Sequence, residues 1–196
     1  MNEEMVGYHG TKKESVQFIC ANNFNINEDV NNKLFLGFGI YFFYSCDDAI
    51  DWNVKNFIKE FSTLPQYDML LDKFSIIESK IKVDETEILD LDEKENLYKF
   101  EMLVDKIKVK LAMSQEYARS PNKTAAILNM LYKRKLTAKK VISKTFIEEI
   151  GTKHLHSLKN YPRKMFCVKD KSIILENKEK IDLNKNSFES IIYFYK

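Results

Sequence analysis

The chain has few of the residues that interrupt or cross-link a backbone. Its 196 residues include only five glycines, three prolines and three cysteines. Cys20, Cys46 and Cys167 are odd in number and widely spaced, which argues against a disulfide framework and favours reduced thiols. No apolar run approaches the ~18 residues of a membrane span, and the acidic start lacks the apolar stretch of a targeting segment. We expect a cytoplasmic protein with a single domain over residues 1–196.

Charge is nearly balanced overall but segregated along the chain. The formal net charge is +2. Residues 28–104 carry 8 Lys and 17 Asp or Glu, whereas residues 105–144 carry 11 Lys or Arg and two acids. A basic segment of this density is typical of a nucleic-acid-binding surface. The plain alternative is a solvated helical surface that offsets the acidic segment.

Hydrophobic patterning predicts strands, then helices, then strands again. Strands are expected at 6–11, 38–44, 74–83, 87–91, 164–168, 171–176 and 188–195. Helices are expected at 12–22 and 46–60, and a block of two to four helices at about 92–150, with a loop at 61–72. Thr11 and Glu14 would form a capping box for the first helix. This order predicts an α+β domain whose sheet is completed by its C-terminus.

Four of the five glycines gather in two short stretches. Gly7 and Gly10 flank Tyr8-His9, and Gly37 and Gly39 flank Phe38. Glycine is best placed where a backbone turns sharply or lies against a ligand, so the two stretches predict a cleft for a flat molecule. The second stretch lacks the third glycine and the helix start of a dinucleotide fingerprint. A turn without a ligand is the alternative.

The same stretches resemble the diphtheria-toxin-like ADP-ribosyltransferases, the superfamily of the poly(ADP-ribose) polymerases. In that family a strand ending in His-Gly-Thr or His-Gly-Ser precedes a helix and then Gly-x-Gly-Ile-Tyr-Phe, and the signature is His, Tyr and Glu on three strands. His9 and Tyr41 match the first two members. Trp52, the only tryptophan, matches a second aromatic eleven residues after the Tyr. The resemblance is specific over residues 6–53.

The resemblance implies a split antiparallel sheet around an NAD cleft, with the helical insertion at about 92–150. The His9 side chain would bind the adenosine ribose, and the Gly10 backbone would bind the nicotinamide carboxamide. Tyr41 and Trp52 would enclose the cationic nicotinamide ring. The remaining expected NAD contacts are Tyr8, Thr11 and Gly39. Ala49 stands near a position where the family often has Ser.

The third family residue has two alternative registers. Glu189-Ser190-Ile191-Ile192-Tyr193 is similar to the family strand Glu-Tyr-Ile-Val-Tyr. This register makes Glu189 the third catalytic residue, beside His9 and Tyr41. The other register puts Met165 in that place and makes 188–195 the following strand. Family members with an apolar residue there lose chain elongation but can retain mono-ADP-ribosyl transfer, so neither register excludes activity.

The implied function is mono-ADP-ribosyl transfer from NAD to a macromolecule, by an intracellular toxin or antiviral defence effector. The basic segment favours RNA as the acceptor, with protein next. An antitoxin or another regulatory protein is the further expected partner. The non-enzymatic alternative is a degenerate module that binds NAD, ADP-ribose or a partner, and Met165 favours it. No metal is expected, because His154-x-His156 lacks a third ligand.

Overall fold

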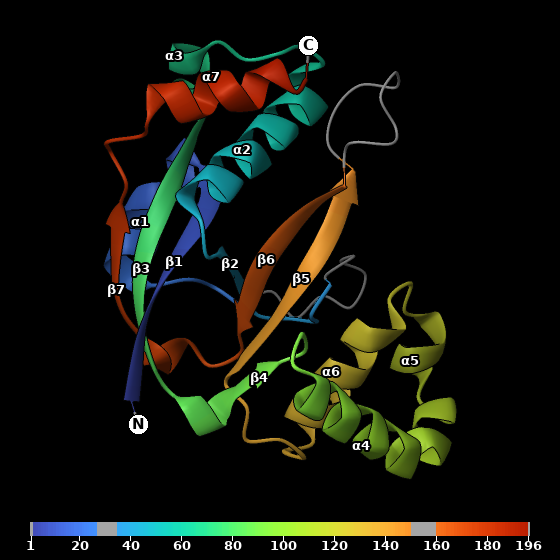
Figure 1. The fold of residues 1–196 in the computed structure, drawn as a ribbon. Coiled ribbons are helices and arrows are strands. Elements are labelled where there is room, and N and C mark those ends of the chain that lie inside the picture. The colour runs from blue at the N-terminus through green and yellow to red at the C-terminus, as the bar shows by residue number, and fades with distance from the viewer. Residues whose placement is uncertain (1, 27–34, 150–159, 196) are drawn as a thin grey trace.

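The computed structural model describes residues 2–26, 35–149 and 160–195. It confirms the α+β class: the strands form one seven-stranded sheet in the order β4-β5-β6-β2-β1-β3-β7 (Figure 1). The strands are β1 (Asn2–Lys12), β2 (Ile40–Phe43), β3 (Phe74–Asp84), β4 (Ile88–Asp90), β5 (Val141–Glu149), β6 (Asn160–Val168) and β7 (Ile174–Glu179).

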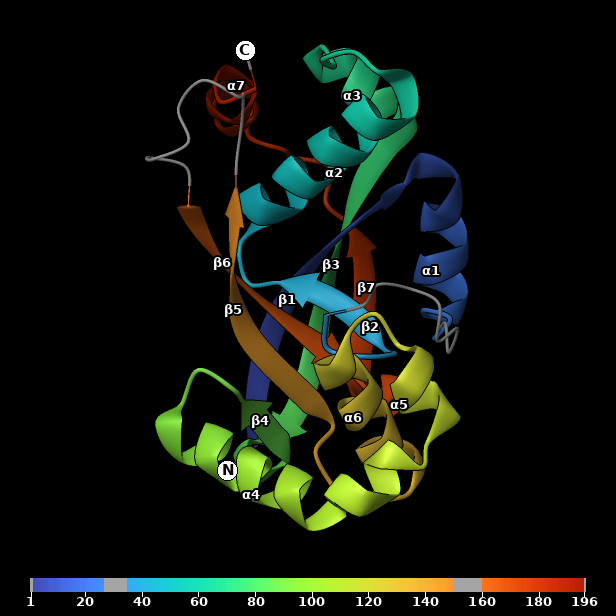
Figure 2. The same cartoon turned by 90° about the vertical axis from the view of Figure 1, so that its right-hand side faces the viewer.

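Except for α1, which lies beside β7, the helices gather at the two ends of this sheet. They are α1 (Val16–Asn22), α2 (Cys46–Phe61), α3 (Tyr67–Lys73), α4 (Lys94–Ala112), α5 (Gln115–Arg119), α6 (Lys123–Lys133) and α7 (Lys185–Tyr193). Figures 1 and 2 show α2, α3 and α7 together at one end and α4, α5 and α6 at the other. Helix α2, which follows the glycine motifs, and the basic segment therefore belong to different ends of the molecule.

The sheet is mixed, and its two halves meet at a narrow junction. β1 pairs antiparallel with β3 along its whole length, from Asn2 opposite Asp84 to Lys12 opposite Phe74. It joins β2 only where Tyr8 lies opposite Phe43. β2 continues into β6, and β4 runs parallel to β5. An antiparallel sheet was expected, and the parallel pairing of β4 with β5 departs from it. β1 and β2 diverge directly beside the His-Gly-Thr motif.

Two hydrophobic clusters cover opposite faces of the central strands. Phe42 and Phe166 belong to the cluster beneath α1, and their rings stack with centroids 5.4 Å apart. Phe43 and Met165 belong to the cluster beneath α2 and α7. Side chains alternate between the faces of a strand, so neighbouring phenylalanines serve different clusters.

Several expected elements are corrected by the structure. The segment expected as a strand at 188–195 is part of helix α7, because Phe188 and Ile192, four residues apart, form one buried stripe. The loop expected at 61–72 contains most of helix α3. The helical insertion expected at about 92–150 ends at Lys133, since residues 141–149 form β5 inside the sheet.

The expected start of the first helix is also wrong. β1 continues through Lys12, and a short 3₁₀ helix over Lys13–Ser15 follows it without a side-chain cap. Thr11 and Glu14 therefore form no capping box. Val16 and Ile19 of α1 are buried, whereas Phe18 and Cys20 are exposed.

A buried ionic cluster anchors α2 to the sheet and to the C-terminal segment. Arg163 of β6 is only 1% exposed. Its Nε donates to Asp48 Oδ1 at 3.2 Å, and its guanidinium also donates to Asp51. The hydroxyl of Tyr195 donates to Asp51 Oδ1 at 2.6 Å. Burying a charge is costly unless it is paired, so these groups depend on one another and fix α2 against β6.

We expect Arg163→Met to lower the free energy of unfolding by about 3–5 kcal/mol, because it removes the buried cation that Asp48 and Asp51 share, although Asp51 keeps its pair with Lys55 at 3.3 Å. Urea denaturation measures this loss. The triple variant Arg163→Met, Asp48→Asn, Asp51→Asn should recover part of it, since the two buried carboxylates are then neutral amides. Arg119→Met, at an exposed site, is the control and should stay within about 0.5 kcal/mol of the parent. If Arg163→Met lowers the free energy of unfolding no more than Arg119→Met does, Arg163 does not anchor α2 to the sheet.

Candidate functional site

A cavity of about 450 Å³ lies where the end of β1 meets α2. Gly10 and Thr11 of β1 line it, together with Trp52, Asn53 and Asn56 of α2. Gly10, Thr11 and Trp52 are three of the residues that the sequence predicts to contact NAD. The fold therefore brings both ends of the 6–53 motif region to one cavity.

Gly10 allows α2 to approach β1 closely. A Cβ atom on residue 10 would lie 2.5 Å from Asn53 Oδ1 and 3.0 Å from the Ala49 carbonyl oxygen. Asn53 holds this approach in place, since its Nδ2 donates to the Ser75 carbonyl of β3 at 2.9 Å. The close packing of α2 on β1 therefore requires a glycine at position 10, whether or not a ligand binds there. Ala49 is fully buried at this contact and supplies no hydroxyl.

Trp52 offers a partly exposed aromatic face to the cavity. It is 37% exposed, whereas Ala49 and Phe57 on the same helix are buried. One side of its ring packs against Phe43, with centroids 6.1 Å apart. A half-exposed aromatic side chain on a rigid helix is suited to stacking on a planar ligand.

His9 lies on the other face of the sheet. It is next to Gly10 in β1, so alternation directs its side chain away from the cavity. Its ring packs edge-on against Phe24 and Phe42, with centroids 4.9 Å and 6.0 Å apart. Nδ1 donates to the Tyr41 carbonyl oxygen at 2.7 Å, which couples β1 to β2 where the backbone pairing ends. Burial lowers the pKa of His9, and the bond to Tyr41 opposes this shift only in part.

The Tyr41 hydroxyl is used within the protein. It donates to the Gly37 carbonyl at 2.6 Å and accepts from the Leu36 N–H at 2.8 Å. Burial raises the pKa of Tyr41, so the phenol stays protonated. No ring contact joins Tyr41 to Trp52 within the described part of the chain. Of the two aromatic residues expected around nicotinamide, Trp52 lines the cavity and Tyr41 does not.

Gly37 and Gly39 are explained by packing. Both have positive φ, at 79° and 144°. A Cβ on Gly37 would lie 2.1 Å from Asn129 Oδ1, and one on Gly39 would lie 2.4 Å from Cys167 Sγ. At Gly39 the space that a Cβ would take is filled by β6. The segment is a tight turn, and the expected contact of Gly39 with NAD stays a prediction.

Lys169 stabilises this turn from beneath and was not found by sequence reasoning. It is 2% exposed, and its Nζ donates to the carbonyls of Leu36 at 2.6 Å and Phe38 at 2.5 Å. Burial lowers the pKa of Lys169. No motif marks this role, because a lysine at the end of an apolar strand normally reaches solvent. Only the fold shows that residues 36–38 cover it.

The two candidates for the third family residue occupy different places. Glu189 is exposed on α7, beside Asn186 and Tyr193, and does not line the cavity at Gly10. Met165 is buried in β6 directly opposite Phe43 of β2. The strands that carry His9, Tyr41 and Met165 are therefore consecutive in the sheet. Tyr8 is half-buried on the α2 face and does not line the cavity either.

A second cavity, of about 660 Å³, lies between the start of β1 and the β4–β5 pair. Met5, Tyr44, Asp90 and Ser143 are among its lining residues. It contains no residue predicted for NAD. Among the described residues no group of His, Cys, Asp or Glu is arranged to hold a metal, and His154 and His156 lie outside them. No described helix is long and apolar enough to span a membrane.

Comparisons with protein-family models, with curated proteins and with solved structures give no match. Function is therefore inferred from the residues of the site and from their geometry.

The environment of His9 predicts a loss of stability in mild acid. Its pKa in the folded protein lies below the unfolded value of about 6.5, so only the unfolded chain takes up a proton as the pH falls past that value. Stability should decrease below pH 6.5 by up to about 1.4 kcal/mol per pH unit until the folded pKa is reached. Urea midpoints at pH 7.5, 6.5 and 5.5 measure the slope. His9→Gln should flatten it, and equal slopes in both proteins would show that another group is responsible.

Proposed function

We propose that the protein is an NAD-dependent mono-ADP-ribosyltransferase whose nicotinamide site is the cavity between Gly10 and Trp52. One observation carries this proposal. The glycine that follows the motif histidine and the aromatic residue expected to stack on nicotinamide line the same cavity, although they come from different elements. The cavity volume of about 450 Å³ suits a small planar group in a cleft.

The chemistry needs orientation and charge more than a covalent intermediate. The nicotinamide of NAD is a cationic aromatic ring, and the face of Trp52 would attract it by stacking and by cation–π interaction. A nucleophilic oxygen or nitrogen of the acceptor forms a bond to C1 of the ribose. The bond from C1 to the nicotinamide nitrogen breaks, and its electron pair leaves with neutral nicotinamide. The nucleophile's proton passes to solvent. Holding these groups in line supplies most of the acceleration.

Transfer of a single ADP-ribose is favoured by Met165. In the second of the two registers this residue takes the place of the third family residue, and it lies on β6 beside β2. An apolar side chain there implies mono-transfer. The proposal gives Glu189 no catalytic role, because that residue lies on the exposed face of α7.

The second candidate function is NAD or ADP-ribose binding without transfer. It is favoured by the same Met165, which leaves no carboxylate at the position of the third family residue. The two functions differ in one observable. Both require NAD to bind beside Trp52, but only the enzyme moves label from NAD to an acceptor.

The acceptor is proposed to be a nucleic acid, with RNA first, bound at the end of the molecule formed by α4, α5 and α6. Part of the positive charge there serves the fold. Lys139 Nζ donates to the carbonyls of Thr86 and Ile88, Lys140 pairs with Glu87 at 2.7 Å, and Lys123 donates to carbonyls at the end of α5. Exposed cations on these helices or directly after them include Lys106, Lys108, Arg119 and Arg134. These four form the proposed acceptor surface.

Trp52→Ala should weaken NAD binding about tenfold and lower transfer at sub-saturating NAD equally, because the stacking face is removed. Equilibrium dialysis with labelled NAD and label transfer to total RNA or protein measure the two quantities. Phe18→Ala, which removes an exposed aromatic ring from α1, is the control and should change neither. NAD binding without label in any acceptor would favour the binding module. An absence of NAD binding by the parent protein would overturn both functions.

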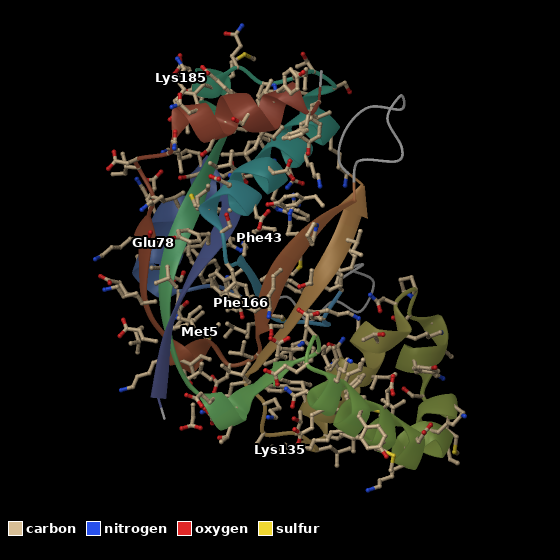
Figure 3. All side chains as sticks on the ribbon, viewed as in Figure 1. Met5, Phe43, Glu78, Lys135, Phe166 and Lys185 are labelled. Carbon is tan, nitrogen blue, oxygen red and sulfur yellow. The ribbon has the colours of Figure 1, made fainter. Side chains whose placement is uncertain are left out.

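Changing Lys106, Lys108, Arg119 and Arg134 together to Gln should weaken RNA binding and flatten its dependence on salt by about one unit of slope for each phosphate that the variant no longer neutralises. Acceptor-free NAD hydrolysis should be unchanged, because the cavity lies at the other end of the molecule. The control changes the same number of exposed lysines elsewhere, namely Lys73, Lys82, Lys171 and Lys185. Figure 3 shows Lys185 at the opposite end from Lys135, which follows α6. If both variants bind RNA alike, the basic helices are only a solvated surface.

A further inference from the structure

Helix α4 carries an exposed apolar stripe on the side that faces away from the core. Its other side packs in one cluster with α6, and the side chains that do so are Phe100, Leu103, Val104 and Ile107. The stripe consists of Tyr98, Met102 and Val109, continued by Met113 directly after the helix, and all four are exposed, Val109 by 77% and Met113 by 82%. Figures 1 and 2 show α4 at the outer edge of its end of the molecule. A helix that is apolar on two opposite sides is normally covered on both, so the stripe indicates a second contact.

The residues of the stripe are spaced symmetrically. Along the chain the intervals between them are four, seven and four residues, which is the same order from either end. Two α4 helices that run in opposite directions and are centred on each other would therefore bring Tyr98 opposite Met113. The same arrangement brings Met102 opposite Val109. The stripe thus fits a second copy of itself, because every apolar side chain meets another one.

Charges beside the stripe favour the same antiparallel arrangement. Glu101 and Lys108 are seven residues apart, so they lie two turns apart on one flank of the stripe, and both are exposed. Around the two-fold axis of an antiparallel pair, each flank meets the same flank of the other copy. Lys108 then lies beside Glu101 of the second copy, and this pair occurs twice. A parallel pair would instead place Glu101 beside Glu101 and Lys108 beside Lys108, which is repulsive.

We propose that α4 is a dimerisation surface on which a second copy of this chain docks in the antiparallel direction. A two-fold contact of this kind uses the same residues of both copies, so it closes after two chains. The contact is a single pair of helices and is smaller than a standard interface, so we expect a weak dimer with a dissociation constant of about 10 μM. The cavity at Gly10 and Trp52 lies at the other end of the molecule and takes no part in it.

Sedimentation velocity tests the stripe. The parent protein should be mostly monomeric at about 1 μM and mostly dimeric at about 100 μM. Val109→Glu should stay monomeric at both concentrations, because its carboxylate would be buried in the apolar contact. Ile181→Glu is the matched control and should dimerise like the parent, since Ile181 is 79% exposed and lies between β7 and α7. Both substituted side chains are exposed, so neither variant should unfold.

Charge reversal tests whether the occupant is a second copy in the antiparallel direction. Glu101→Lys puts two lysines at each of the two charge contacts, and Lys108→Glu puts two acids there, so each variant alone should dimerise at least about tenfold more weakly than the parent. An equal mixture of the two variants should dimerise at least as tightly as the parent, because every contact then joins a lysine to a glutamate. All samples are first freed of nucleic acid, since Lys108 also belongs to the proposed acceptor surface.

Each outcome decides for or against the dimer. A parent protein that stays monomeric at about 100 μM overturns the proposal and leaves the stripe to a partner of another kind. Dimerisation of Val109→Glu equal to that of Ile181→Glu overturns the role of the stripe. Charge variants that dimerise like the parent when alone, or remain weak when mixed, overturn the antiparallel pairing. Loss of the dimer in Val109→Glu, with its recovery in the mixture, supports the proposal.

Discussion

The position of helix α2 against the sheet is the constraint on which the rest of the site depends. One side of the helix is held by the buried Arg163, which pairs with Asp48 and Asp51. The other side packs onto β1, where only a glycine at position 10 leaves enough room. These two contacts place Trp52 and its neighbour beside the end of β1. Without them the cavity has no second wall.

Beside the short β2 strand, His9 and Gly10 have different roles on the two faces of the sheet. It meets β1 at a single residue pair, and beyond that point the His9 side chain takes over the connection by bonding to the Tyr41 carbonyl. His9 and Tyr41 thus hold the diverging strands together, while Gly10 faces α2. In the ligand-free fold these two signature residues act as supports of the cavity rather than as its lining. A neutral imidazole packed among aromatic rings is suited to this, because it donates one hydrogen bond without introducing charge.

The two proposed binding sites, one for NAD and one for the acceptor, lie at opposite ends of the molecule. The cavity lies at the end with α2, α3 and α7, and the exposed cations of α4, α5 and α6 lie at the other (Figure 2). Electrostatic capture of a polyanion needs no contact with the reacting atoms, because it raises local concentration over long range. A long acceptor such as RNA can be held at one end while another part reaches the ribose of NAD.

The sequence alone determined the α+β class and strands β1, β2 and β3, and it singled out three of the residues that line the cavity, Gly10, Thr11 and Trp52, because periodicity and glycine position are local signals. It misjudged 188–195, where an apolar run suited both strand and helix and packing against α2 selected the helix. Only the tertiary structure decided that Glu189 lies away from the cavity, that Lys169 is buried, and that Asn53 packs against Gly10. Each of these depends on which distant segment covers a side chain, and no spacing along the chain encodes that.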